Sequence, residues 1–155
     1  MAKMTIVGMD DYARKLSQLG QASVAISKKA VYAGASVVAD EVKRRLKDNI
    51  KDTTYVGKKP GGGVKSDKST GDLVESLGVA PIGVDGRGNT NTKIGFDGYD
   101  SNGVPNALKA RAMESGTSTL RKRPFVRPAV NAVKGKAQEK MGAVVDEEIA
   151  KIYAL

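Results

Sequence analysis

Apolar residues recur at helical spacing along two long stretches of the chain. From residue 24 to residue 46 they follow one another at steps of seven, four, three, four and four. From residue 126 to residue 152 the steps are four, three, four, four, four, four and three. Such spacing places them on one face of a helix, so we predict two long amphipathic helices, one N-terminal and one C-terminal. Their apolar positions are Val24, Val31, Ala35, Val38, Val42 and Leu46, and Val126, Val130, Val133, Ala137, Met141, Val145, Ile149 and Ile152.

Residues suited to helix ends mark the predicted boundaries. Asp10 is a favourable N-cap for a first short helix, and Gly20 is expected to end it before the longer helix begins at Ser23. Proline is tolerated in the first turn of a helix. Pro105 is therefore expected to open a short helix that runs to about residue 113, and Pro124 to lie in the first turn of the last helix.

The middle of the chain has the composition of strands joined by turns. Residues 73–84 and 92–99 are strand-like, and the Gly- and Asn-rich residues 85–91 between them predict a β-hairpin. Residues 100–103 predict a further turn. Together with the helices, this pattern predicts an α+β fold, in which two long amphipathic helices pack on a small antiparallel sheet.

Glycine, serine, threonine and lysine dominate residues 51–71, which hold few apolar side chains. Such a segment buries too little to offset the entropy of ordering it. We therefore predict a flexible basic loop that becomes ordered on assembly, within a single domain of residues 1–155. The basic residues expected to act from this loop are Lys58, Lys59, Lys65 and Lys68.

The composition excludes several classes of chemistry. The 155 residues contain no Cys and no His, which excludes disulfides, thiolate metal sites and histidine-based hydrolytic triads. A Walker phosphate loop also fails, because Gly63 follows Gly62 where that motif requires lysine. A Ser–Lys dyad stays open, although nothing in the sequence points to one. We expect no enzyme activity, no cofactor and no metal.

Membrane association is not expected either. No apolar run approaches the ~20 residues needed to cross a bilayer. The N-terminal segment is also too short in apolar residues for a secretion signal. We therefore expect a soluble protein that stays in the cytoplasm until it is assembled.

The net charge of +9 is distributed unevenly. Residues 43–68 and 105–134 each carry +6, whereas residues 69–104 between them carry −3. A basic block indicates a polyanion or an acidic partner surface, or else a solvated face that only aids solubility. Few aromatic residues accompany the basic ones, so any contact with nucleic acid is expected to involve the phosphate backbone without sequence readout.

Two motifs carry a resemblance to a known family. The first is Thr70-Gly71-Asp72-Leu73-Val74-Glu75-Ser76-Leu77, and the second is Glu114-Ser115-Gly116-Thr117 followed by Arg123-Pro124-Phe125-Val126-Arg127-Pro128-Ala129. Across roughly residues 5–153 the chain resembles the tail-completion, or head–tail joining, proteins of long-tailed bacteriophages. The resemblance implies an α+β subunit of a ring, usually six-fold, at the head–tail junction of the virion. It also implies no catalysis and no cofactor, with other copies, head-completion proteins and tail-tube proteins as partners.

The motif residues are the candidate site. Gly116 is expected at a left-handed or strained turn, and Phe125 as the anchor of the last helix on the sheet. Whether the motif residues only support the fold or also contact a neighbouring subunit stays open. The candidates are Thr70, Gly71, Leu73, Ser76, Glu114, Gly116, Thr117, Arg121, Arg123, Pro124, Phe125, Arg127 and Pro128.

Three cations stand just before the predicted last helix, at Arg121, Lys122 and Arg123. A helix dipole disfavours cations at that end, so we expect them to meet an acidic partner, such as residues 69–104 of an adjacent subunit. Two functions remain from the sequence. One is a ring-forming virion protein that completes the tail and joins it to the head. The other is a basic DNA-associated protein that binds the phosphate backbone.

Overall fold

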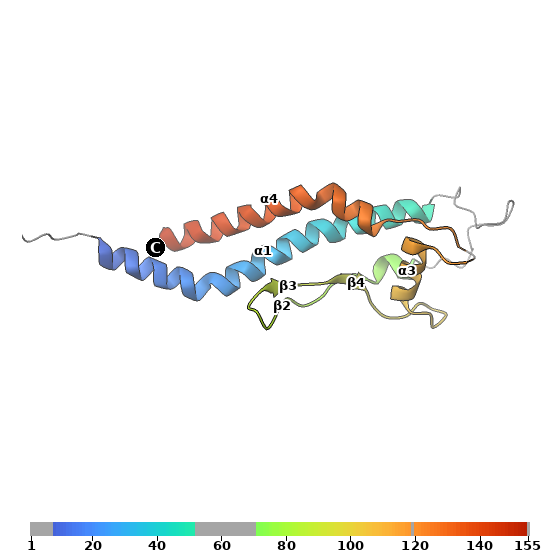
Figure 1. Ribbon diagram of the computed structural model, residues 1–155, viewed down its shortest axis with the longest axis horizontal. Coiled ribbons are helices and arrows are strands. Elements are labelled where there is room, and N and C mark those ends of the chain that lie inside the picture. The colour runs from blue at the N-terminus through green and yellow to red at the C-terminus, as the bar shows by residue number, and fades with distance from the viewer. Residues whose placement is uncertain (1–7, 52–70, 119, 155) are drawn as a thin grey trace, which may run out of the picture.

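A computed structural model describes residues 8–51, 71–118 and 120–154. Two long helices lie side by side, and short strands and helices run along one side of the first (Figure 1). The predicted α+β class is therefore confirmed. The basic loop lies outside the described residues except for residues 51 and 71, as do Lys58, Lys59, Lys65, Lys68 and Thr70. The elements are α1 (Met9–Lys51), α2 (Asp72–Glu75), β1 (Leu77–Val79), β2 (Gly83–Val84), β3 (Thr90–Asn91), β4 (Ile94–Phe96), α3 (Asn106–Ser115) and α4 (Val126–Tyr153).

The first helix, α1, is continuous over 43 residues, so the predicted break at Gly20 is wrong. Gly20 lacks the positive φ with which glycine ends a helix, and a glycine inside a helix costs only about 1 kcal/mol relative to alanine. Ser23 lies in mid-helix, where its hydroxyl donates to the carbonyl oxygen of Gly20 at 2.8 Å. Asp10 lies in the first turn rather than at the cap, where its charge still favours the positive end of the dipole.

Helices α1 and α4 run antiparallel and pack closely through small residues. A side chain at Gly34 would place its Cβ 2.6 Å from Met141 Sδ, so the glycine leaves room for the Met141 side chain to lie against α1. Ala30 and Ala137 are buried on either side of the same contact. Further along the pair, Lys29 Nζ donates to Glu148 at 2.7 Å. The apolar stripes predicted from the spacing therefore meet each other over much of their length.

Two positions of those stripes are not buried as predicted. Val24 is 50% exposed and Val130 is 39% exposed. The hairpin contacts α1 near this position, where the hydroxyl of Ser27 lies 3.0 Å from that of Thr90, yet Val24 itself stays exposed. Val130 lies at the edge of a small cavity of about 180 Å³ beside Val42. Helical spacing alone does not say how far a partner element extends.

The predicted hairpin is confirmed, but its strands are shorter than expected. Strands β1 and β4 pair antiparallel, with Leu77 opposite Phe96, and β2 pairs with β3 beyond them. Residues 73–75 were predicted as strand and instead belong to α2. The backbone of Gly71 has a φ of 85°, and its carbonyl oxygen accepts the N–H of Val74 at 2.9 Å, which starts this turn. Pro81 lies between β1 and β2, where it has no N–H to donate to a strand pair.

The main core lies where α1, α2, α3, the hairpin and the start of α4 meet. Its buried members are Val42, Leu46, Val74, Ala110, Phe125 and Ala129. Phe125 is 1% exposed and meets Phe96 of β4 edge to face, with ring centroids 6.0 Å apart. Phe125 thus anchors the start of α4 on the sheet, as predicted. Pro124 precedes the helix rather than lying in its first turn, a position that Pro128 occupies instead.

Candidate functional site

Glu114 joins the end of α3 to the start of α4. Its carboxylate accepts three backbone N–H groups, those of Phe125 at 2.7 Å, Val126 at 2.9 Å and Arg127 at 3.1 Å. The N–H groups of a first helical turn have no partner within their own helix. A carboxylate from another helix therefore caps α4 and matches the positive end of its dipole. This contact explains why the motif pairs a glutamate with a distant arginine–proline–phenylalanine sequence.

The cap also lowers the pKa of Glu114. Partial burial by itself raises this pKa, but the three backbone N–H groups and the nearby Arg127 lower it more strongly. The carboxylate is consequently ionised at neutral pH, and its charge is directed at the backbone of α4. It is therefore mainly a structural residue within the subunit, although it also lines the surface described below.

Gly116 is required by both its conformation and its surroundings. Its φ of 75° and ψ of 172° belong to a region that is essentially restricted to glycine. An added Cβ would also lie 2.9 Å from the backbone nitrogen of Lys122. The following turn is closed by Thr117, whose N–H donates to the carbonyl of Leu120 and whose hydroxyl accepts the N–H of Leu120, both at 2.9 Å. Of the two conformations expected at Gly116, left-handed or strained, the structure has the strained one, with a positive φ outside the left-handed helical region.

Arg123 connects the loop before α4 to the last turn of α1. Its guanidinium donates to the carbonyl oxygen of Asn49 at 3.2 Å, and the side-chain amide of Asn49 donates to the carbonyl of Arg123 at 3.2 Å. Its backbone N–H donates to the carbonyl of Met113 at 2.6 Å. From the sequence, Arg123 was expected to face only the positive end of the α4 dipole. Arg123 in fact lies at the negative end of α1, where a cation is favourable.

The remaining motif residues occupy different positions around this core. Leu73 packs against the core and Ser76 donates its hydroxyl to the carbonyl of Leu73 at 2.9 Å, so the first motif supports the fold. Arg121, Lys122, Pro124 and Arg127 are exposed. The structure therefore brings the two motifs to one core and leaves part of the second motif on the surface.

A groove runs over the surface of this region, and we call it the motif groove. It has a volume of about 430 Å³ and lies between β4, α3 and the start of α4. Apolar residues of β4, α3 and α4 line it together with two arginines that both carry exposed side chains. The lining residues are Ile94, Phe96, Ala110, Arg111, Glu114, Ser115, Val126 and Arg127.

The sequence predicted a turn at residues 100–103. It did not predict the side-chain contacts that order the loop between β4 and α3. The buried carboxylate of Asp100 accepts the N–H of Val104 at 2.7 Å and pairs with Lys109 of α3. Lys109, followed by the backbone N–H groups, lowers the pKa of Asp100 to about 2. The amide of the buried Asn106 donates to the carbonyl of Asp97 at 2.9 Å. An Asp-Ser-Asn-Gly sequence is typical of such side-chain-closed turns and could have indicated it.

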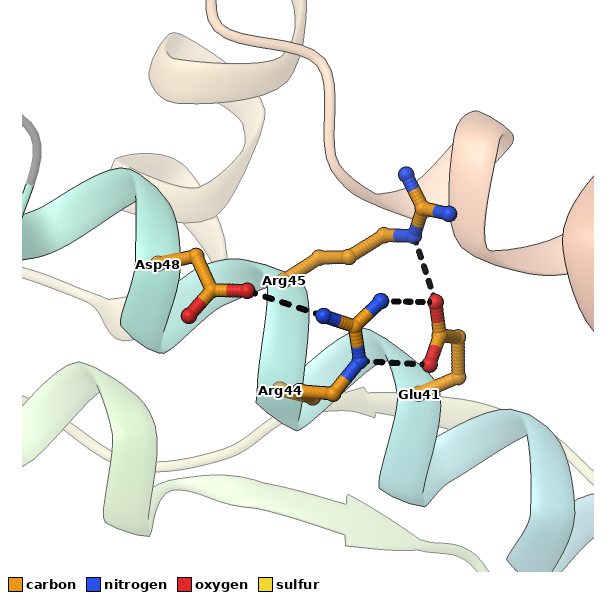
Figure 2. Close-up of polar contacts among 4 residues, drawn as sticks. All are labelled: Glu41, Arg44, Arg45 and Asp48. Atoms are coloured by element: carbon orange, nitrogen blue, oxygen red, sulfur yellow. Dashed lines mark hydrogen bonds and ion pairs between the residues drawn. The ribbon is translucent and has the colours of Figure 1, made fainter.

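Part of the first basic block is neutralised within α1 (Figure 2). Glu41 accepts from Arg44 at 2.6 Å and from Arg45 at 2.7 Å, and Arg44 also contacts Asp48 at 3.0 Å. Hydrogen bonds from Arg44 and then Arg45 lower the pKa of Glu41 to about 2. These two arginines are therefore committed to neighbours one turn away on the same helix.

The described part of the chain offers neither a metal-ion cluster nor a membrane-spanning helix. Within residues 8–51, 71–118 and 120–154, His, Cys, Asp and Glu side chains nowhere gather in threes at a place that could hold a metal ion. None of the helices in those ranges is long and apolar enough to cross a membrane.

The chain matches a known family from α1 to the start of the turn after α3. Residues 10–116 match the family described as "Bacteriophage HK97-gp10, putative tail-component". No curated protein and no solved structure matches the chain. The match covers about two thirds of the sequence, including the first motif and both Glu114 and Gly116, and it confirms the resemblance to phage tail-completion proteins. The chain therefore belongs to the HK97-gp10-like family of bacteriophage tail components.

Proposed function

We propose that this tail component is a subunit of a homo-oligomeric, six-fold ring at the junction of the phage head and tail. In that position it completes the tail and joins it to the head, with head-completion and tail-tube proteins as neighbours. The observation that carries the proposal is membership of the tail-component family, which makes the protein part of the virion tail. The role is structural rather than catalytic.

The distribution of charge supports assembly into a ring. Residues 71–104 carry five acidic and two basic residues, whereas residues 105–134 carry one acidic and seven basic residues. A ring requires heterologous contacts, in which two different surfaces of the same subunit meet. Opposite net charge on two segments of one chain favours such contacts over the pairing of identical surfaces.

The net positive charge fits a position around a DNA channel. A charge of +9 in each of six subunits places on the order of fifty positive charges around the DNA that must pass. We propose that the loop lysines Lys58, Lys59, Lys65 and Lys68 make contacts with phosphate that depend on salt and not on base sequence. Arg44 and Arg45 do not belong to this set, because Glu41 already binds them.

Native mass spectrometry and electron microscopy of phage particles test the proposal. We expect a discrete oligomer, or a monomer that forms a ring in the particle, and an antibody label at the head–tail junction. A phage that lacks this chain should accumulate separate heads and tails. Joined, infectious particles without the protein would refute the proposal. A tight DNA shift in a gel with no self-association would instead support the DNA-associated alternative.

A further inference from the structure

Tyr99 is the most exposed large apolar side chain among the residues that the structure describes. It is 71% exposed and lies in the loop between β4 and α3. Tyrosine at such a position exposes an apolar ring to water. It is also one of the residues most enriched at the centres of protein interfaces. The exposed ring of Tyr99 is therefore a candidate anchor for a protein partner.

The loop that carries Tyr99 is held in place by buried polar groups. Asp100, the next residue, is 7% exposed, and its carboxylate is held by Lys109 and by the backbone N–H groups of Asn102 and Val104. Tyr99 itself forms a β-bridge with Pro105. A surface loop needs no such support to connect a strand to a helix. A loop that is already ordered before binding loses less conformational entropy on association. An ordered loop therefore suits a residue that anchors a partner.

The motif groove has the complementary character. Its apolar lining includes Ile94, Phe96 and Val126, which suits an aromatic ring. Arg111 and Arg127 also line it. Arg127 interacts electrostatically with Glu114, but that carboxylate accepts the backbone N–H groups at the start of α4, and no salt bridge of Arg111 or Arg127 forms within the described residues. The groove therefore suits an apolar side chain that is accompanied by an anion.

The Tyr99 loop supplies that combination. Asp97 is exposed two residues before Tyr99, and Asp72 approaches the same loop by accepting the N–H of Ser101 at 3.1 Å. Within one subunit, Tyr99 does not line this groove. Tyr99 is held at the start of α3, whereas Arg111 and Ser115 line the groove at its other end. The ten residues of α3 span about 15 Å.

We propose that Tyr99 of one copy docks into the motif groove of a second copy, with Asp97 facing Arg111 and Arg127. The inference rests on the proposed ring and names the surfaces that would form it. Because the loop and the groove are different surfaces of one subunit, each copy can bind one neighbour on each side, as a closed ring requires. The segment 71–104 then meets the basic segment 105–134 of its neighbour, which agrees with their opposite charges.

Paired variants of the full chain test the contact directly. Tyr99→Ala leaves the groove intact, and Arg111→Glu leaves the loop intact. We expect each variant alone to lose self-association by roughly 30-fold or more, as for a central aromatic anchor. Mixing the two should restore one intact contact, so that heterodimers but no larger oligomers appear in native mass spectrometry. Tyr32→Ala, at another exposed tyrosine, should assemble as the unmodified chain does. Absence of heterodimers in the mixture would overturn the inference.

Disulfide trapping covers a contact that is too weak to survive dilution. The chain has no cysteine, so a Tyr99→Cys variant and a Ser115→Cys variant each contain one thiol. Oxidation of the mixture should give a covalent heterodimer far faster than a mixture of Leu108→Cys and Ser115→Cys, because Leu108 is 57% exposed but lies on α3, outside the loop that docks. Equal rates would refute the docking while leaving a self-associating ring protein intact. No self-association of the unmodified chain, even in particles, would refute both proposals.

Discussion

Removal of the Glu114 carboxylate is the most informative change to the fold of this protein. Glu114→Ala leaves three backbone N–H groups at the start of α4 without their acceptor, and those of Phe125 and Val126 are part-buried. Glu114→Gln keeps an acceptor oxygen but removes the charge. Glu139→Gln, at an exposed position of α4, is a matched control that removes a charge and leaves the cap intact.

The expected magnitude follows from the contacts that are lost. A hydrogen bond to a charged group contributes about 1.5–3 kcal/mol, and loss of a helix cap costs about 0.5–2 kcal/mol. Water can replace the acceptor at the exposed Arg127 but less easily at Phe125, so the three contacts do not add in full. We expect Glu114→Ala to lower the free energy of unfolding by about 2–3 kcal/mol and Glu114→Gln by about 1 kcal/mol.

The dependence on pH identifies the charge as the cause. The pKa of Glu114 is lowered in the folded protein, so its contribution is present above the pKa of the unfolded chain and is lost as pH falls through the folded value. Urea unfolding, followed by circular dichroism, should show a difference between unmodified protein and Glu114→Gln at pH 7 that shrinks at pH 3. A difference that stays constant over this range, or one no larger than that of Glu139→Gln, would refute the capping role.

Other substitutions test separate contacts by the same unfolding measurement. Gly116→Ala should cost at least about 2 kcal/mol because both its φ and its neighbours oppose a side chain, whereas Gly86→Ala, with open space around it, should change little. Phe125→Ala should cost about 3–5 kcal/mol because the ring is 1% exposed, and an unchanged urea midpoint would contradict its burial. Arg123→Ala should cost about 1–2 kcal/mol through its bond to α1, and a stability equal to the unmodified chain would contradict that bond. Arg121→Glu should keep the stability and weaken assembly in native mass spectrometry, and normal assembly would remove Arg121 from the proposed interface.

Local pattern was enough to predict most of the elements of this protein. The spacing of apolar residues predicted α4 almost to its ends, and the Gly- and Asn-rich turn predicted the hairpin. Both signals depend on residues close in sequence, because the period of a helix or a two-stranded turn is a property of the backbone itself. The two motifs were recognisable for the same reason, as short runs of defined residues.

Tertiary structure decided which residues act across elements. Glu114 caps a helix that begins 12 residues after it, and Arg123 reaches a carbonyl 74 residues away in the sequence. Periodicity does not predict such contacts. They form only because the packing of α1 against α4 brings distant parts of the chain together. The sequence also misplaced a helix end at Gly20, where glycine disfavours a continuing helix by only about 1 kcal/mol. The exposure of Val130 depends on which elements cover that part of α4, which helical spacing does not report.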